Sequence, residues 1–511
     1  MIKFIITEYT HGFKVKVAFS NLRYVAINFA RIFTSYELVF DRKARRKVMR
    51  PTTVFATANP TMDEFGFLLR DLPEFLAILE RMGITDSEIT RRIVKPKKGV
   101  AISFKMPGIE ARPHQIPALK FLAELKPTRV LPLPTGTGKT LTTLMSLMAK
   151  GERAMLVMQA GHIKTWLATI NEMTDVSKKD IMVVQGSNSM EVFVQLADMN
   201  AISEKLILVS STTFDKYLET YIKGEAVTGR SYPVRPEDLM AKAGIGVCVV
   251  DECHELLKQV VRRTIMLNVP QWIFLSATLR SNQDTINRIY ESIYPISDQF
   301  TDFVNNSHAT VHPTYYRLLQ PNTVKCSGPQ GYNHNIYETF ILSRPKLREG
   351  YFDMIYSLFT RDYIKNRKPK TRALVFFSSI ACAEAFGSYL KDKLPSDMSF
   401  GVYHSQVPPK AKATILENSE LLISTPKSLG TGIDIPNITF AVMTQALAST
   451  QLAQQVLGRP RIVKEYKDES PRFYYLSCLS IDKHLQYDRN HLIDFSDKSK
   501  IMIPIHTGIA I

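Results

Sequence analysis

Short apolar runs alternate with helical patterns along most of the chain. Across residues 101–305, the runs that predict buried strands are Ala154–Met158, Ile181–Val184, Leu206–Ser210, Val247–Val250 and Trp272–Leu275. Across residues 347–490, they are Ala373–Phe377, Phe400–Tyr403, Leu421–Ser424, Ala441–Met443 and Phe473–Leu476. Strands that alternate with helices are typical of parallel sheets with helices on both faces. The pattern therefore predicts an α/β chain with two tandem, doubly wound lobes.

The remaining segments have patterns of their own. Within residues 1–100, the expected strands are Ile2–Thr7, Phe13–Ala18, Tyr36–Phe40 and Thr52–Ala58, and Leu22–Phe33 has helical spacing. Asp71–Met82 predicts a helix that Asp71 caps and Gly83 ends. We expect residues 1–100 to form a small α+β domain, followed by a basic linker from Arg91. Residues 306–346 are rich in loop signals and predict a connection between the lobes, and 491–511 predict a C-terminal tail.

The strongest chemical signal is Pro134-Thr-Gly-Thr-Gly-Lys-Thr140, which lies between an apolar stretch and a helical pattern. Glycines in such a turn let backbone N–H groups face phosphates. Lys139 would reach the outer phosphates, and Thr140 would hold Mg²⁺. Leu133 stands where a general P-loop has its first glycine. We expect this turn to bind ATP through Pro134, Thr135, Gly136, Thr137, Gly138, Lys139 and Thr140.

A second apolar strand, Ile245–Val250, runs directly into Asp251-Glu-Cys-His254. Asp251 is predicted to hold Mg²⁺, and Glu252 to orient and deprotonate the attacking water. A lone Gly-Lys-Thr can be a polar turn, and a lone Asp-Glu pair can be a solvated strand end. Together, in this order and each at a strand end, they predict an ATP-hydrolysing enzyme.

The composition of the chain also indicates the class of its binding partner. Of 511 residues, 65 are Lys or Arg and 48 are Asp or Glu, which gives a net charge of +17. Such an excess favours a polyanion, and nucleic acid fits better than membrane because no apolar run approaches about 18 residues. The N-terminus has no signal-peptide pattern, and the five cysteines are scattered without a Cys-x-x-Cys pair. We therefore expect a cytoplasmic protein without a structural metal, with a monomer favoured.

Further short elements suit a two-lobed ATPase. Gln115 precedes Lys139 by 24 positions and has an amide that can read an adenine edge. Ser276-Ala-Thr278 follows a strand end, where hydroxyl residues also serve as simple helix caps. In the second lobe, Thr431 would touch nucleic-acid phosphates, and Asp434 the ATP ribose. Arg459 would neutralise charge on the transferred phosphoryl group from across a cleft, although a salt-bridged surface helix would also explain it.

As a set, these motifs resemble those of superfamily 2 helicases over roughly residues 105–480. The resembling segments are Pro134–Thr140, Asp251–His254, Ser276–Thr278, Gly432–Asp434 and Gln455–Arg459. The resemblance implies two RecA-like lobes with ATP and Mg²⁺ between them. It also implies nucleic-acid contacts in segments carrying Thr165 and Trp166, Thr212 and Thr213, and Ser378 and Ser379. The family's last motif usually ends Gly-Arg-x-x-Arg, whereas here Ile462 holds the last position and Arg461 lies one residue earlier.

Within the superfamily, the order of segments looks like the UvsW-like branch-migrating helicases of bacteriophages. That resemblance implies ATP-driven unwinding or branch migration of forked and junction DNA in phage replication, recombination or repair, in the host-cell cytoplasm. Residues 1–100 would then be an accessory DNA-binding domain. Their run from Asp41 to Arg50, which includes Arg42, Arg45 and Arg46, would contact DNA phosphates, although a solvated turn is the simpler interpretation of an isolated charge run. We interpret Tyr24, Phe29 and Phe33 as core residues.

Three alternatives remain open at this point. The first is an RNA helicase, which the absence of an Asp-Glu-Ala-Asp sequence and the presence of Arg280 disfavour. The second is a duplex translocase without strand separation. The third belongs to a different class: an ATP-gated nucleic-acid clamp without motor activity, which the altered arginine spacing alone supports.

Overall fold

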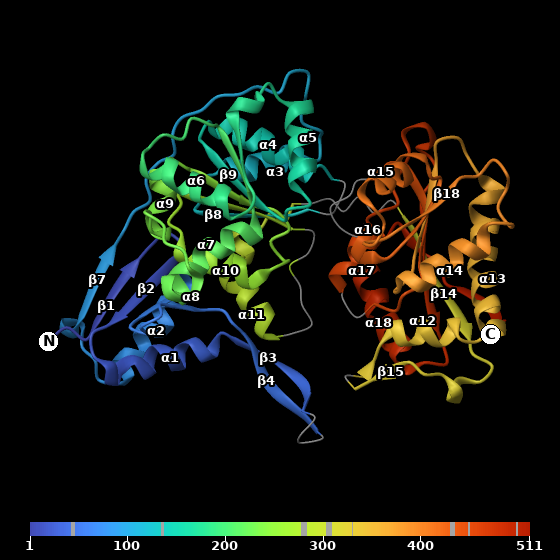
Figure 1. Cartoon of the computed structure of the whole chain (residues 1–511), viewed down its shortest axis with the longest axis horizontal. Coiled ribbons are helices and arrows are strands. Elements are labelled where there is room, and N and C mark those ends of the chain that lie inside the picture. The colour runs from blue at the N-terminus through green and yellow to red at the C-terminus, as the bar shows by residue number, and fades with distance from the viewer. Residues whose placement is uncertain are drawn as a thin grey trace. The chain divides into compact units, whose positions relative to one another are not determined.

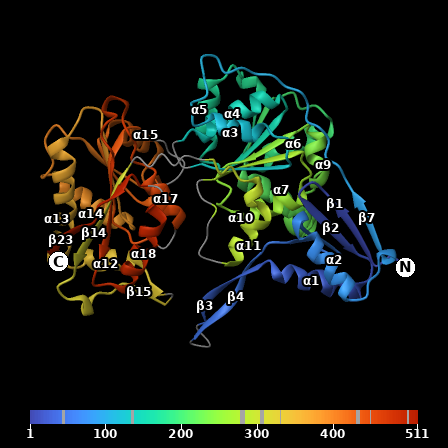
Figure 2. The same ribbon diagram turned by 180° about the vertical axis from the view of Figure 1, so that it is seen from behind.

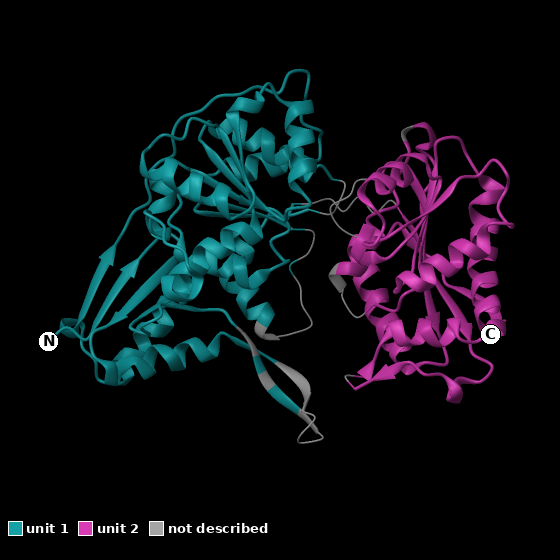
Figure 3. Ribbon diagram, in the orientation of Figure 1, with its two compact units in different colours: residues 1–303 teal, residues 304–511 magenta. Residues whose placement is uncertain are grey.

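The computed structural model describes residues 1–41, 46–133, 137–276, 279, 284–302, 309–329, 331–429, 435–447, 450–496 and 499–511. It divides into two compact units, Met1–Phe303 and Val304–Ile511, which Figure 3 shows in different colours. None of the described helices is both long and apolar enough to cross a membrane.

The first unit begins with a small domain built on a five-stranded sheet of order β5-β6-β2-β1-β7 (Figure 1). Its strands are β1 (Phe4–Glu8), β2 (Gly12–Val17), β5 (Thr57–Ala58), β6 (Glu64–Leu68) and β7 (Ile89–Ile93). The helices α1 (Arg23–Ile32) and α2 (Leu72–Arg81) bury aromatic side chains against one face of the sheet. The ring of Phe67 stacks on that of Phe75 and meets that of Phe29 edge-on. This cluster of phenylalanines is the core of the small domain.

A two-stranded hairpin leaves this domain as a separate arm. It consists of β3 (Thr34–Asp41) and β4 (Arg46–Val54), which pair in antiparallel register from Thr34 and Val54 to Asp41 and Arg46. Figures 1 and 2, seen from opposite sides, both show the arm extending away from the five-stranded sheet. Asp41 and Arg46, which flank positions 42–45 of the basic run, therefore pair at the far end of the hairpin.

The rest of the first unit is a six-stranded parallel sheet of order β10-β11-β9-β12-β13-β8. Its strands are β8 (Thr128–Pro132), β9 (Ala154–Met158), β10 (Ile181–Val184), β11 (Leu206–Ser210), β12 (Val247–Val250) and β13 (Gln271–Ser276). One face packs on α3 (Ile116–Ala123), α4 (Lys139–Lys150) and α5 (Ile163–Met173). The other packs on elements that include α6 (Ser187–Asp198), α7 (Ser211–Lys223), α9 (Pro236–Lys242), α10 (Leu257–Met266) and α11 (Asp284–Ile293). The short helix α8 (Glu225–Thr228) follows α7.

The small domain and this lobe share one continuous core because the small sheet docks directly on α10. A Cβ atom at Gly12 would lie 2.7 Å from the backbone of Ile265, and one at Gly66 would lie 2.6 Å from the Ile265 side chain. Only glycine permits so close an approach between the sheet and the helix. The β1–β2 turn adds a polar latch, in which the Thr10 hydroxyl donates to Asn268 Oδ1 at 2.9 Å.

The second unit is a parallel sheet of order β18-β19-β17-β20-β21-β14-β22, with β23 also paired to β14. The strands are β14 (Thr310–Arg317), β17 (Arg372–Phe376), β18 (Phe400–Tyr403), β19 (Leu421–Ser424), β20 (Ile438–Met443), β21 (Arg472–Cys478), β22 (Ile501–Met502) and β23 (Ile505–Ala510). One face carries α12 (His334–Leu342), α13 (Pro345–Asp362) and α14 (Ile380–Leu390). The other carries α15 (Pro409–Asn418), α16 (Pro426–Leu429), α17 (Thr450–Leu457) and α18 (Asp482–Ser496). A small hairpin, β15 (Ser327–Gly328) and β16 (Gly331–Tyr332), precedes α12.

The predicted α/β class with two doubly wound parallel lobes is confirmed. Three segments differ from their expectations. The expected connection, 306–346, contributes β14 to the interior of the second sheet, and the expected tail, 491–511, contributes β22 and β23 beside it. The basic linker from Arg91 overlaps β7, which pairs in parallel with β1. In each case the segment forms a strand because it pairs with a strand that is distant in the sequence, although its own pattern does not predict one.

Two residue-level expectations also differ. Phe29 and Phe33 are buried as expected, but Tyr24 on α1 is half exposed and does not belong to the core. Asp71 precedes α2 at the expected position, yet its side chain makes no capping hydrogen bond. The carboxyl lies instead beside Ser292 of α11, and burial raises the pKa of Asp71 to about 6.

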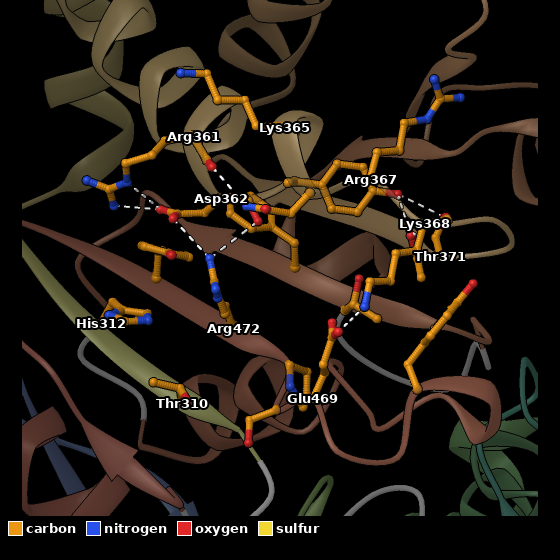
Figure 4. A pocket seen from close by; sticks show the side chains of 18 of the residues that line it. Thr310, His312, Arg361, Asp362, Lys365, Arg367, Lys368, Thr371, Glu469 and Arg472 are labelled. Carbon is orange, nitrogen blue, oxygen red and sulfur yellow. Dashed lines mark hydrogen bonds and ion pairs between the residues drawn. The ribbon is translucent and has the colours of Figure 1, made fainter.

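The second sheet has a polar hollow of about 830 Å³ at the amino ends of β14 and β21 (Figure 4). Four of the cationic side chains that line it are paired with acidic ones. Arg361 and Arg472 both contact Asp362, at 2.5 Å and 3.0 Å. Lys368 pairs with Glu469, and Arg367 pairs with Glu420 at 2.6 Å. We interpret this wall as an ion-pair network that fastens the loops at this edge of the sheet.

His11 lies where the small domain packs on the ATP-binding lobe, and its surroundings predict that the stability of the fold depends on pH. Its Nε2 lies 2.9 Å from Pro127 O, its Nδ1 is buried without a hydrogen-bond partner among the described residues, and burial lowers the pKa to about 4. Because the folded pKa lies below the ordinary 6.5, the stability contributed by neutral His11 is complete above pH 6.5. It is lost as the pH falls toward 4, by about 3 kcal/mol.

His11→Phe keeps the edge-on contact with Trp272 but cannot be protonated. We expect thermal unfolding to show the variant less stable than the parent above pH 6.5. As the pH approaches 4, that difference should shrink or reverse. A stability difference that stays constant over this range would contradict the account.

Candidate active site

The end of β8 leads into the first turn of α4, where the sequence predicts a phosphate cradle. Pro134, Thr135 and Gly136 lie outside the described residues. Gly138 has φ +85° and ψ 33°, a left-handed conformation that glycine adopts without strain. Lys139 and Thr140 then form the first residues of α4. Backbone N–H groups at a helix start carry partial positive charge, so the described part of this turn suits an anionic group.

Lys139 reaches across to the acidic turn at the end of β12. Its Nζ lies 3.1 Å from Glu252 Oε1, and both side chains are only slightly exposed. Burial disfavours the ammonium charge, yet the carboxylates of Glu252 and Asp251 raise the pKa of Lys139 above its ordinary value. An ammonium has three donors, so Lys139 can hold Glu252 and still contact phosphate oxygens.

Asp251 is the first residue after β12 and is held by three groups. Trp166 Nε1–H donates to its Oδ2 at 2.9 Å, and His162 Nδ1 lies 3.4 Å from the same oxygen. The backbone N–H of Glu252 donates to Oδ1 at 3.0 Å. Burial opposes the charge, but the contacts from His162, Lys139 and Trp166 hold the pKa of Asp251 below its usual range. Asp251 is therefore an ionised carboxylate.

Glu252 has φ +47°, a strained value for a residue with a side chain, of the kind found at functional sites. Its Oε2 is buried and has no hydrogen-bond partner among the described residues. His254 Nδ1 lies 3.4 Å from that oxygen and 2.9 Å from the Ser276 hydroxyl at the end of β13. An acceptor oxygen buried in this way fits a proton acceptor for a bound water.

The same groups fit a magnesium ion. A carboxylate has about four lone-pair sites, and Mg²⁺ prefers oxygen ligands from one or two carboxylates together with phosphates and water. Asp251 Oδ1 keeps a lone pair after accepting from Glu252, and Thr140 lies in the first turn of α4, where the predicted hydroxyl ligand belongs. The donor set is therefore suitable for Mg²⁺ on a nucleotide.

Gln115 is buried beside this turn and packs against its backbone. Its Nε2 donates to the Thr142 hydroxyl at 3.1 Å, and its Oε1 accepts from the backbone N–H of Arg112 at 2.9 Å. His114 Nε2 lies 3.1 Å from Thr137 O. In this structure the Gln115 amide is used within the chain, where it braces the start of α4. Its expected role in reading adenine stays a prediction.

Comparison with known families agrees with this geometry. Residues 108–281 match the family model described as "Type III restriction enzyme, res subunit", and residues 351–462 match "Helicase conserved C-terminal domain". The first contains the Lys139 turn and Asp251, and the second contains Arg459. The chain is a superfamily 2 helicase. It is accordingly an ATP-hydrolysing enzyme with nucleic-acid helicase domains. No curated protein matches the chain.

Several solved structures are similar to this helicase at low sequence identity. Dbp5 of S. cerevisiae, bound to RNA and ADP BeF3, has 15% identity and a TM-score of 0.49, with 77% of this chain and 90% of that chain covered. Mss116p, bound to ssRNA and AMP-PNP, has 15% identity and a TM-score of 0.49, with 76% and 73% covered. The Hef helicase domain of Pyrococcus furiosus has 12% identity and a TM-score of 0.44, with 74% and 98% covered.

The predicted residues of the helicase's second unit are only partly described. Arg459 follows α17, and its side chain is buried. Arg461 is half-buried, and its backbone N–H donates to Ile438 O at the start of β20. Thr431 and Asp434 lie outside the described residues. The catalytic roles of Arg459 and Arg461 therefore stay predictions.

The predicted nucleic-acid contacts of the helicase fall into two groups. Thr213 and Ser378 are engaged within the chain: Thr213 Oγ1 accepts from Gly186 N–H at 2.8 Å, and the Ser378 hydroxyl donates to Asn335 Oδ1 at 2.5 Å. Thr212 is exposed at the start of α7, and its hydroxyl lies 3.1 Å from that of Ser210. Arg42 and Arg45 lie outside the described residues, as does the side chain of Arg46.

Sequence reasoning missed two supporting contacts, one in each unit. It assigned Trp166 to a nucleic-acid-contacting segment, but the side chain is 2% exposed and turned toward Asp251. It did not identify Glu338 of α12, whose carboxylate accepts from the backbone N–H groups of Ser378 and Ser379, both at 2.7 Å. Burial raises the pKa of Glu338 to about 7. No local pattern of the sequence signals either contact, because Trp166 and Asp251 lie 85 positions apart and Glu338 and Ser378 lie 40 apart.

Glu252→Gln tests the assignment of the proton acceptor. The change keeps the size of the side chain and removes its charge, so we expect turnover of ATP to fall about 10²- to 10⁴-fold while ATP still binds. Steady-state hydrolysis and equilibrium nucleotide binding measure the two effects. Glu255→Gln, which alters a carboxylate one turn further along, is the matched control and should lose far less. Retention of turnover in Glu252→Gln would rule out this role.

Proposed function

We propose that the chain is an ATP-dependent DNA helicase or translocase that unwinds or branch-migrates forked and junction DNA. The observation that carries the proposal is the buried cluster of Lys139, Asp251 and Glu252 on strand and helix ends of a superfamily 2 helicase. The family model matched by residues 108–281 is named for a subunit of a restriction enzyme. The net charge of +17 favours a polyanionic partner.

Each residue of the cluster has a role in ATP hydrolysis. Lys139 binds the outer phosphates, Thr140 and Asp251 hold Mg²⁺, and Glu252 orients and deprotonates the attacking water. Magnesium bound there supplies neutralising charge on the phosphates. Glu252 is suited to its role because one of its oxygens is fixed by Lys139 and the other is an acceptor without a hydrogen-bond partner among the described residues. Such prearranged charges lower the barrier without reorganisation.

The N-terminal domain contributes DNA contacts through the β3–β4 arm. The run from Asp41 to Arg50 is dense in Lys and Arg, and the antiparallel pairing of the two strands places its flanks at the far end of the hairpin. Contacts of this kind hold a duplex through its phosphates without reading its sequence. The close packing of the small sheet on α10 joins the domain that carries the arm to the ATP-binding lobe.

Arg459 is proposed to neutralise charge on the transferred phosphoryl group. Arginines in this role accelerate phosphoryl transfer by about 10³- to 10⁵-fold. We expect Arg459→Ala to cut ATP turnover by about 10³-fold with nucleotide affinity nearly unchanged, and Arg459→Lys, which keeps the charge but loses the planar fork, to lie between. Single-turnover hydrolysis and nucleotide binding separate the two quantities. Loss of affinity with turnover preserved would contradict the role, and Arg461→Ala reports whether a second arginine acts.

The substrate is tested by a panel of nucleic acids. We expect fork and Holliday-junction DNA to stimulate ATP hydrolysis most and to be separated or branch-migrated, with R-loops and linear duplex DNA weaker and RNA weakest. Stimulated ATPase rates and gel-based unwinding at one fixed salt concentration measure this, since phosphate contacts make affinity salt-dependent. Stimulation by RNA alone would replace the proposal with an RNA helicase. Stimulation without strand separation would favour a duplex translocase, and nucleotide-dependent binding without turnover would favour a clamp.

A further inference from the structure

Trp166 of α5 and His162, the residue immediately before α5, both contact the Asp251 carboxylate. Trp166 Nε1–H donates to Oδ2 at 2.9 Å, and His162 Nδ1 lies 3.4 Å from the same atom. Residues four apart on a helix lie on one face, so the first turn of α5 forms a two-point contact on a single oxygen. The indole has one polar atom, which can only donate. Trp166 therefore restrains the orientation of the Asp251 carboxylate.

The contact gives the two carboxylate oxygens of Asp251 different surroundings. Oδ2 faces the donors of α5, whereas the described contact of Oδ1 is the backbone N–H of Glu252 at 3.0 Å. Oδ1 consequently keeps the lone pair that a cation or a bound water can use. The indole also prevents the carboxylate from rotating, since rotation would leave a buried N–H without an acceptor, at a cost typical of an unmade buried hydrogen bond.

The chain offers an internal comparison, because it contains two tryptophans. Both are buried in the first unit, with Trp166 2% exposed and Trp272 fully covered. The Nε1 of Trp272 has no hydrogen-bond partner among the described residues, and its ring stacks on Phe274 with centroids 5.5 Å apart. Trp272 is thus a packing residue, whereas Trp166 directs its only donor at the acidic turn.

We infer that Trp166 is a positioning residue for the divalent cation of the ATPase site. Its indole fixes Asp251 Oδ2, which leaves Oδ1 aimed at the metal, and packing of α5 against the sheet holds the indole in place. The inference rests on the proposed role of Asp251 as a Mg²⁺ ligand. Partners of this kind, which orient a ligand without touching the metal, typically contribute about 10- to 100-fold to metal affinity.

Trp166→Phe tests the inference, because it keeps most of the ring and removes the donor. The measurement is the affinity for a fluorescent ADP analogue as a function of Mg²⁺ concentration, together with the affinity in EDTA and the melting temperature. We expect the Mg²⁺ concentration for half-maximal binding to rise about tenfold, with the affinity in EDTA unchanged. Trp272→Phe is the matched control and should leave the Mg²⁺ dependence in place.

Two outcomes of this experiment are decisive. A lower melting temperature without a shift in Mg²⁺ dependence would make Trp166 a packing residue and overturn the inference. Asp251→Asn separates this failure from that of the proposed function. If Asp251→Asn shifts the Mg²⁺ dependence and Trp166→Phe does not, only the positioning role fails. If neither variant shifts it, the assignment of Asp251 as a metal ligand fails as well.

Tryptophan fluorescence gives an independent measurement in a protein that keeps the contact between Trp166 and Asp251. Trp272→Phe leaves Trp166 as the only tryptophan, so its emission reports the surroundings of Asp251. We expect Mg²⁺ with ADP to change the emission and ADP in EDTA to have little effect, and we expect the added Asp251→Asn substitution to abolish the Mg²⁺-dependent part. Emission that does not respond to Mg²⁺ with ADP would overturn the inference.

Discussion

The structure of the first unit depends on one constraint: two carboxylates end a buried strand and must be matched by donors. Asp251 and Glu252 follow β12, which lies between β9 and β13 in the interior of the sheet. Removing one partner of a buried charge typically costs about 3–5 kcal/mol, so the surrounding elements are selected to supply donors. Lys139 at the start of α4 meets Glu252, and α5 meets Asp251. The helices that cover this face of the sheet are therefore fixed by the acidic turn as well as by their apolar contacts.

The same turn is tied to the N-terminal domain through α10. This helix begins three residues after His254 and is the surface on which the small sheet packs, with Gly12 and Gly66 allowing backbone-close contact to Ile265. The small domain thus extends the core of the ATP-binding lobe without a separating linker. The helix α10 therefore connects the nucleotide turn directly to the small sheet.

Much of this could be predicted from the sequence, because the strands of both lobes are short continuous apolar runs between turn signals. Ile181–Val184, Leu206–Ser210, Phe400–Tyr403 and Leu421–Ser424 have the same bounds in the structure. β14 was missed because His312, Pro313 and Thr314 interrupt its apolar pattern, although pairing with β21 makes it a strand. The contact between Trp166 and Asp251 joins residues 85 positions apart, and no local pattern reveals such a pair. The motifs of the sequence therefore predict the chemical groups of the site, whereas the residues that hold those groups in place are known only from the structure.

The central claim is that Lys139, Asp251 and Glu252 form the hydrolytic centre of an ATP-driven motor that nucleic acid stimulates. The most direct measurement is the rate of ATP hydrolysis with and without branched DNA, for the parent and for Lys139→Ala, with folding checked by thermal unfolding. The account predicts that DNA stimulates the parent and that the folded variant has no stimulated activity. DNA-stimulated hydrolysis that survives in Lys139→Ala would contradict it.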